Sequence, residues 1–148
     1  MKKLKKSKSI AAVYGPEAPP RLGLPLYLAK IPAGFPSPAD DFIDKKLDLN
    51  EHLIKHPAAT FFVKVQGHSM TGAGIHSGDI LIVDRALEPD DKRIAVVALN
   101  GELTVKRLKK AKGRLFLVSE NPEYKAIEVT PEMDFEVWGV VIHVIHTV

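Results

Sequence analysis

The chain has 148 residues, of which 45% are hydrophobic and none is cysteine, and a formal net charge of +3. This length and composition suit one folded domain with a short extension, and the absence of cysteine excludes disulfides, a thiolate nucleophile and thiolate metal sites. No apolar run approaches the roughly 20 residues that cross a bilayer, so we expect a cytoplasmic protein without membrane contact.

Residues 1–25 predict a flexible arm. Five lysines lie within the first eight residues, and four prolines follow between positions 16 and 25. Because like charges repel and proline donates no backbone hydrogen bond, we expect this arm to be extended or disordered, a solvated tail rather than a dedicated nucleic-acid arm. Residues 24–31 are apolar enough to dock in extended form, and the proline-rich segment 32–38 predicts an exposed loop.

The rest of the chain predicts a mainly β domain. Asp48 or Asn50 can cap a short helix that runs to His56. Asn100-Gly101 predicts a two-residue hairpin, since both residues tolerate positive φ. From residue 60 onward, β-branched and aromatic runs recur with almost no helical periodicity, which is typical of strands. The predicted strands are 60–66, 80–84, 93–99, 102–108, 114–118, 126–129 and 135–145.

The loop Gly67-His68-Ser69-Met70 offers a candidate nucleophile. Gly67 allows a sharp turn after an apolar strand, which would present Ser69 beside backbone N–H groups able to bind an oxyanion. A serine beside a glycine is usually only a turn residue, so Ser69 needs a base. Lys106 lies on a predicted strand, where burial would lower its pKa and let a neutral amine accept a proton. On spacing alone, however, Lys106 is more simply part of the basic run 106–114.

The six histidines indicate neither a better base nor a metal site. His68 adjoins Ser69, so their side chains diverge on extended backbone. His143 and His146 have no carboxylate signature nearby, and no pair of histidines shows the spacing of paired metal ligands. We expect surface or hydrogen-bonded histidines and no cofactor, although the sequence does not exclude a Ser-His-Asp triad.

Several motifs occur in order along the chain: Gly34–Ala39, Leu47–Asn50, Ile54–Pro57, Gly67–Met70, Gly78–Asp84, Gly101–Leu108 and Val137–Val144. Together they resemble the LexA/UmuD family of self-cleaving serine peptidases, peptidase S24, and the first three are nearest to UmuD. The resemblance covers residues 24–148 and implies the β fold of the LexA/UmuD C-terminal peptidase domain.

The family's Ser/Lys dyad falls on Ser69 as nucleophile and Lys106 as neutral general base. By the same resemblance the scissile bond is Ala33–Gly34, although UmuD typically has cysteine where Ala33 stands. The backbone N–H of Ser69, or of a preceding residue such as Gly67, would form the oxyanion hole. Cleavage would separate the basic arm, residues 1–33, from a peptidase and dimerisation domain, residues 34–148.

The predicted cut also divides the charge. Residues 1–33 carry seven basic residues and one acid, a net charge of +6. Residues 34–148 carry fourteen basic and seventeen acidic residues, a net charge of −3. The overall +3 therefore describes a basic arm joined to an acidic body.

The resemblance further implies a role in the SOS response. A RecA–single-stranded DNA filament would trigger cleavage, and the processed homodimer would serve a UmuC-like Y-family DNA polymerase in error-prone translesion synthesis. A LexA-like repressor is less compatible, because residues 1–33 leave little room for a helix-turn-helix domain. A signal peptidase uses a similar dyad but would need a membrane anchor, and we expect none because no apolar run is long enough. A non-catalytic β-rich nucleic-acid-binding module stays possible and predicts salt-dependent DNA binding without self-cleavage.

Overall fold

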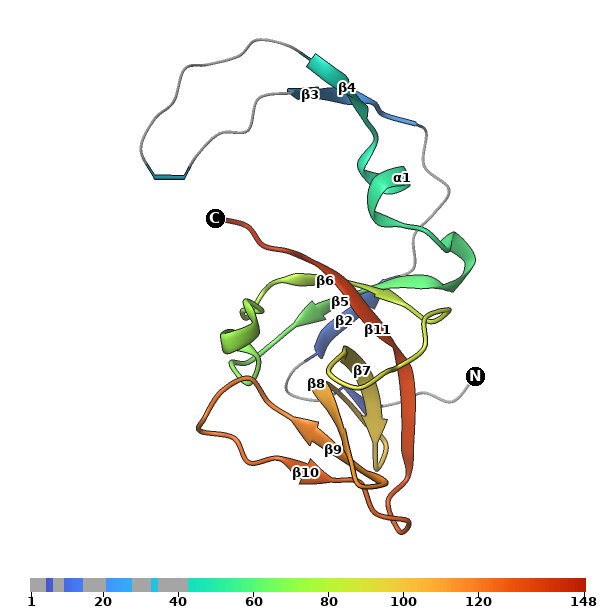
Figure 1. Ribbon diagram of the computed structural model, residues 1–148, viewed down its shortest axis with the longest axis vertical. Helices are drawn as coiled ribbons and strands as arrows, with labels where there is room; N and C mark the ends of the chain where they lie inside the picture. Colours follow the sequence, from blue (N-terminus) through green and yellow to red (C-terminus); the bar gives the residue numbers. More distant parts are fainter. Residues whose placement is uncertain (1–4, 7–9, 15–20, 28–32, 35–42) are drawn as a thin grey trace. The chain divides into compact units, whose positions relative to one another are not determined.

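Short apolar strands joined by tight turns make up most of the chain. The computed structural model describes residues 5–6, 10–14, 21–27, 33–34 and 43–148 (Figure 1). The chain divides into two compact units, one formed by residues 1–16 and 56–148 and the other by residues 17–55. Each unit is described by itself. No helix within the described ranges is long and apolar enough to span a membrane.

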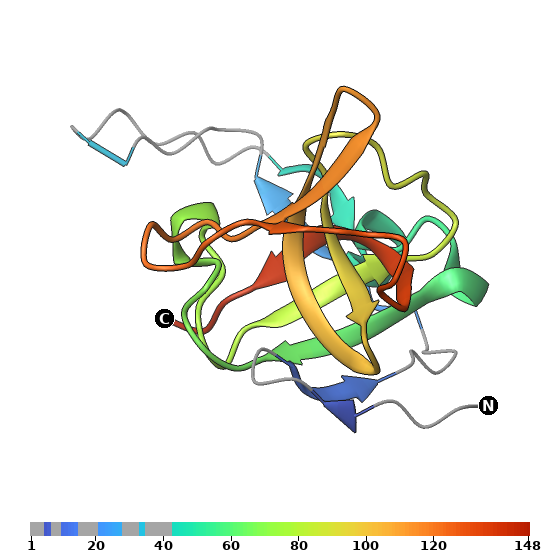
Figure 2. The same ribbon diagram turned by 90° about the horizontal axis from the view of Figure 1, so that it is seen from below.

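The larger unit is built on a nine-stranded sheet with the order β10-β9-β8-β7-β11-β6-β5-β2, and β1 pairs additionally with β8. Every pairing is antiparallel except β1–β8. Figure 2 shows that the sheet is strongly twisted and curled. The strands are β1 (Lys5–Lys6), β2 (Ile10–Tyr14), β5 (Thr60–Val65), β6 (Ile80–Asp84), β7 (Ile94–Leu99), β8 (Glu102–Ala111), β9 (Arg114–Val118), β10 (Ile127–Glu128) and β11 (Phe135–Ile145).

The seven strands predicted from residue 60 onward are all present, which confirms the mainly β fold. Asn100 and Gly101 have φ values of 50° and 85°, so the predicted hairpin turn joins β7 to β8. A second hairpin, which the sequence analysis did not single out, joins β8 to β9 through Lys112 and Gly113, with φ values of 50° and 74°. Strand β8 consequently runs to Ala111, beyond its predicted end.

Strands β7 and β8 each contribute to two hydrophobic cores, because alternate residues of a strand project to opposite faces. One core, here the first core, includes Val63, Met70, Leu81, Val96, Leu103 and Val105. The other, the second core, is formed by Ala95, Val97, Leu108 and Leu117. The alternation therefore places Lys106 on the same face of β8 as Leu108, as the period-two pattern predicts.

The N-terminal segment contains strands that were not predicted. β2 pairs with β5 from Ile10 opposite Val65 to Tyr14 opposite Phe62, and β1 pairs with β8 at Lys5 opposite Glu102. The stretch 10–14 is apolar, contains β-branched and aromatic residues and lacks proline, so it can complete the edge of β5. Charge and proline counts over the whole arm conceal this short stretch, which explains the difference from the expected unpaired tail.

The smaller unit contains an antiparallel pair of strands, β3 (Leu24–Tyr27) and β4 (Ile43–Leu47), followed by helix α1 (Leu49–Leu53). Ala33 and Gly34 lie between the two strands and are exposed. Most of the predicted proline-rich loop, residues 32 and 35–38, lies outside the described residues.

Helix α1 is shorter than predicted. Asp48 caps it as expected, since its carboxylate accepts a hydrogen bond from the Asn50 N–H at 3.0 Å. The helix ends at Leu53 rather than His56, because Ile54 is already extended with φ −111° and ψ 107°. Proline disfavours helical backbone in the residue before it, so the helix must end ahead of Pro57. A separate 3-10 turn, η1 (Pro57–Ala59), follows.

Candidate active site

Ser69 lies in the loop that follows β5, and residues 66–74 of this loop, which include the 3-10 turn η2 (Thr71–Ala73), are here called the Ser69 turn. Gly67 has a φ of 98°, which lets the chain reverse at the end of β5. The next side chain, Met70, is buried in the first core and anchors the turn. Ser69 is only 9% exposed, and no hydrogen bond between described residues uses its hydroxyl.

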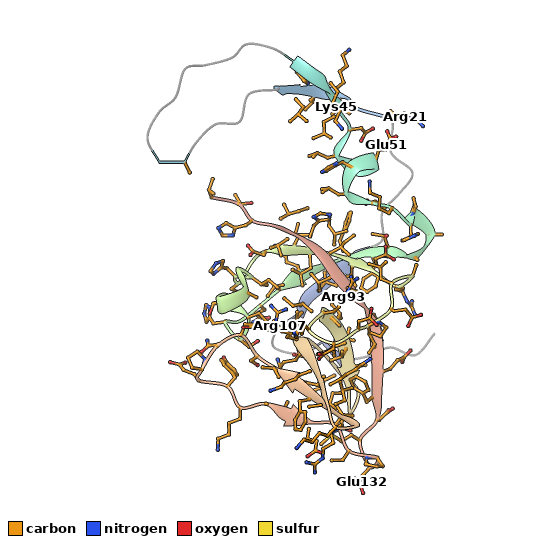
Figure 3. The ribbon with its side chains drawn as sticks, viewed as in Figure 1. Arg21, Lys45, Glu51, Arg93, Arg107 and Glu132 are labelled. Atoms are coloured by element: carbon orange, nitrogen blue, oxygen red, sulfur yellow. The ribbon has the colours of Figure 1, made fainter. Side chains whose placement is uncertain are left out.

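The Ser69 turn is fastened to the residues that follow β9. The Gly72 N–H donates to the Glu120 carbonyl at 2.7 Å, and the Asn121 side-chain amide donates to the His68 carbonyl at 2.8 Å. The Glu120 carboxylate in turn forms an ion pair with Arg107 of β8, which is labelled in Figure 3. Glu120 therefore links the Ser69 turn to the strand that carries Lys106.

Glycine is required at position 72. A Cβ placed there would lie 2.6 Å from the Glu120 carbonyl oxygen, well inside van der Waals contact. Only a residue without a side chain lets the two backbones approach closely enough for their hydrogen bond. The Gly72–Glu120 contact thus depends on the glycine at position 72.

Lys106 is buried on β8, with 8% of its surface exposed. Its Nζ donates to Thr104 Oγ1 at 2.9 Å and to the Val105 carbonyl at 3.2 Å. No ion pair between described residues includes Lys106, so no carboxylate offsets its burial. Burial lowers the pKa of Lys106 below its usual value, as predicted. Lys109 and Lys110 of the same run are exposed, so Lys106 is not part of a solvated basic face.

Beside Lys106, β8 has an edge without a strand partner. β9 pairs with β8 from Arg107 onward, and β1 pairs only as far as Leu103. Residues 104–106 therefore have no ladder partner on that edge among the described residues. At this point β9 has ended, and the residues that hold the Ser69 turn follow it. Figures 1 and 2 both show the loop after β9 beside the Ser69 turn.

The predicted site residues lie in two different units. Ser69 and Lys106 belong to the larger unit, on segments that both connect to Glu120. Ala33 and Gly34 belong to the smaller unit.

The turn presents unused backbone donors. The Gly67 N–H, one of the two oxyanion candidates, donates to Ser77 Oγ at 3.3 Å. The N–H groups of Ser69 and Met70 take part in no hydrogen bond between described residues. They are therefore better placed than Gly67 to receive an anion.

Two histidines bind buried aspartates at the ends of β6, which the sequence analysis missed. His146 Nδ1 lies 2.6 Å from Asp79, and His56 Nδ1 lies 2.6 Å from Asp84. These partners are 67 and 28 positions apart, so no local motif reveals them. Burial raises the pKa of Asp79, but hydrogen bonds from the His76 N–H and from His146 outweigh it and leave that pKa below its usual value. Among the described residues, no group of three or more acidic, histidine or cysteine side chains is placed to hold a metal ion.

Comparison with known proteins identifies the family. A Peptidase S24-like family model matches residues 25–142. The chain belongs to the peptidase S24 family. Its relatives include the ImpA protein of Salmonella typhimurium, 46% identical over 123 residues that cover 82% of this chain and 83% of ImpA. The MucA protein of Escherichia coli is 41% identical over 121 residues, covering 81% of this chain and 82% of MucA.

A third relative of this S24 peptidase is the LexA repressor of Stenotrophomonas maltophilia, 41% identical over 118 residues. That match covers 80% of this chain but only 55% of the repressor. ImpA and MucA are UmuD-like SOS mutagenesis proteins, and they match over most of their length. The chain is accordingly a UmuD-like member of a family of self-cleaving serine peptidases, and its place is in SOS mutagenesis.

Proposed function

We propose that this protein cleaves its own Ala33–Gly34 bond with Ser69 as nucleophile and Lys106 as general base. The observation that carries the proposal is the state of Lys106, a buried lysine that pairs with no carboxylate of the described residues. It lies on the strand that Arg107 and Glu120 connect to the Ser69 turn. Burying an unpaired ammonium is unfavourable, whereas a neutral amine is the form that accepts a proton.

The first half of the reaction forms an ester. Thr104 Oγ1 and the Val105 carbonyl accept the two N–H groups of the neutral amine, which leaves the lone pair of Lys106 Nζ to take the proton of Ser69 Oγ. The oxygen attacks the Ala33 carbonyl carbon, and the N–H groups of Ser69 and Met70 stabilise the resulting oxyanion. The C–N bond then breaks, and the Lys106 ammonium returns the proton to the departing Gly34 amine.

The second half regenerates the enzyme. Lys106 removes a proton from water, the hydroxide attacks the Ala33 ester, and the proton passes back to Ser69 Oγ as the ester breaks. The products are residues 1–33, ending in a carboxylate at Ala33, and residues 34–148. A substrate carried by the protein itself is present at high effective concentration, so a modestly activated base suffices. The exposure of Ala33 and Gly34, and their small side chains, suit them to enter a site in extended form.

The resemblance to the family supports a proposal about the partners. We propose that a RecA–single-stranded DNA filament activates cleavage and that the processed form is an accessory subunit of a UmuC-like Y-family DNA polymerase in the cytoplasm. Removal of the arm changes the side-chain net charge from +3 to −3, which would weaken any nonspecific attraction to DNA. The processed form would then depend on protein contacts.

The end of β11 supports a homodimer. β7 pairs with β11 only up to Val140, so residues 141–145 have no strand on that edge in the described part of the chain. Val144 and Ile145 on this segment are exposed. An open, apolar strand edge favours antiparallel pairing with the same segment of a second copy, which gives the two-fold interface typical of dimers. Ile145→Lys should therefore shift the protein toward monomer in analytical ultracentrifugation.

Self-cleavage is tested by incubating the full chain at alkaline pH and with an activated RecA filament, then sequencing the N-terminus of the product. We expect a fragment that begins at Gly34, and no fragment from Ser69→Ala or Lys106→Ala. Lys109→Ala, an exposed lysine on the same strand, is the control and should cleave normally. An intact parent protein under both conditions, together with salt-dependent DNA binding, would favour the non-catalytic nucleic-acid-binding alternative.

A further inference from the structure

The hydroxyl of Ser119 is a buried polar group without a hydrogen-bond partner among the described residues. Ser119 is 8% exposed, and its Oγ is the buried side-chain atom of the described residues for which no hydrogen bond is present. Buried hydroxyls are nearly always paired in folded proteins, and an unpaired one disfavours folding. The resting structure therefore does not explain why a hydroxyl is buried at this position.

Ser119 is the first residue beyond the end of β9. The β8–β9 ladder ends with Arg107 opposite Val118, so Ser119 adjoins Val118 as Lys106 adjoins Arg107. Side chains at such neighbouring positions of two adjacent strands lie within reach of each other.

The flanking contacts agree with this placement. Arg107 and Glu120 form their ion pair on one face of the two strands, and Leu108 and Leu117 meet in the second core on the other. Alternation therefore puts Ser119 on the face that it shares with Leu117 and with Lys106.

The hydrogen bonds of Lys106 indicate that the Ser119 hydroxyl can supply an additional acceptor for Nζ. Thr104 Oγ1 and the Val105 carbonyl accept two N–H groups from Nζ, which is the number that a neutral amine has. Once Nζ takes the proton of Ser69 it becomes an ammonium with a third N–H. No carboxylate of the described residues pairs with it, so the new charge needs another acceptor.

We propose that Ser119 is a positioning residue whose hydroxyl oxygen accepts the third N–H of Lys106 while the oxyanion exists and releases it as the oxyanion collapses and that proton passes to the Gly34 amine. This inference rests on the proposed Ser69/Lys106 reaction. The hydroxyl lacks a partner in the resting state and gains one when charge develops on the lysine, which is the arrangement of a preorganised dipole. Before the reaction the unpaired hydroxyl lowers the stability of the protein, and its role in activity accounts for its presence.

The proposal has a signature in the pH profile. A hydroxyl that stabilises the ammonium raises the pKa of Lys106 relative to a variant without it. In Ser119→Ala, the rising limb of the pH–rate profile should therefore move to lower pH by about one unit, while the plateau rate falls about ten- to a hundredfold. Ser119→Thr keeps the hydroxyl and should retain the parent's profile.

The experiment measures self-cleavage of the full chain from neutral to strongly alkaline pH for the parent, Ser119→Ala and Ser119→Thr, with thermal unfolding alongside. Ser119→Ala should be as stable as the parent or more so, since it removes an unpaired buried group. An NMR titration of Lys106 in the non-cleaving Ser69→Ala background, with and without Ser119→Ala, reports the same pKa shift directly. A lower rate with an unmoved limb and an unmoved titration would show a packing effect and overturn the proposal.

Failure of the inference and failure of the proposed function are separable. If Ser119→Ala cleaves with the parent's rate and profile while Ser69→Ala is inactive, Ser119 has no role and the dyad stands. If Ser69→Ala itself releases the fragment that begins at Gly34, the dyad fails and the role of Ser119 fails with it.

Discussion

Replacing Gly72 with alanine tests whether the Ser69 turn is held by its contact with Glu120. The added Cβ would lie 2.6 Å from the Glu120 carbonyl oxygen, whereas ordinary contacts begin at 3.4 Å. The two backbones would have to separate by the difference, about 0.8 Å, which also stretches the 2.7 Å Gly72–Glu120 hydrogen bond. Because Ser69 is three residues from Gly72, this displacement moves Ser69, the proposed nucleophile, relative to β8.

The expected magnitudes follow from the geometry. Overpacking is unfavourable by about 1–3 kcal/mol, and the weakened hydrogen bond adds about 1 kcal/mol, so Gly72→Ala should lower the free energy of unfolding by about 2–4 kcal/mol. A nucleophile misplaced by nearly 1 Å loses about a hundredfold in rate. Cleavage should be compared at a temperature where urea titration shows the variant to be folded.

Gly113→Ala is the matched control. Gly113 has a φ of 74° in the β8–β9 turn, and a Cβ there would meet no atom within 4 Å. The variant should lose about 1–2 kcal/mol of stability from backbone strain and keep its cleavage rate. If Gly72→Ala cleaves as fast as the parent, or if both variants slow to the same extent, the Gly72–Glu120 contact does not position Ser69.

Three further predictions concern charge and the arm. Lys106→Met should abolish cleavage. The free energy of unfolding of this variant, relative to the parent, should fall as pH rises toward about 10, because the unfolded parent binds more protons than the folded parent until its lysine reaches a pKa of about 10.4. Urea titrations over pH measure this difference, and a pH-independent difference would contradict the prediction. Asp79→Asn should lose about 2 kcal/mol at neutral pH. It should also lack the parent's further loss of stability as pH falls below about 4 through the lowered pKa of Asp79, which acid unfolding followed by circular dichroism checks. Removing residues 1–33 takes β2 from the edge of β5, so amide exchange in Thr60–Val65 should accelerate about tenfold or more while exchange in β6 stays slow; unchanged exchange in β5 would exclude the pairing.

Local patterns in the sequence determined the strands and their turns. Asn100-Gly101 forms its hairpin because each residue tolerates positive φ, a property of the residues themselves. The alternation along β8 likewise indicates that Lys106 shares a face with Thr104 and Leu108. The candidate residues Ser69 and Lys106 came from local motifs as well, through the resemblance to the peptidase family.

The tertiary structure decided what surrounds those residues. The close approach of Gly72 to Glu120 and the pairing of His146 with Asp79 join segments far apart in the sequence. Lys106 is buried, and it pairs with no carboxylate of the part of the chain that the structure describes. The short strand at residues 10–14 also needed its partner β5, since five apolar residues do not form a sheet alone. Ser119 makes the same point, because a serine after a strand is unremarkable until the fold buries it near the buried Lys106. Sequence patterns specify backbone conformation within a few residues, whereas burial and long-range pairing, which set the chemistry of a side chain, exist only once the sheet has closed around it.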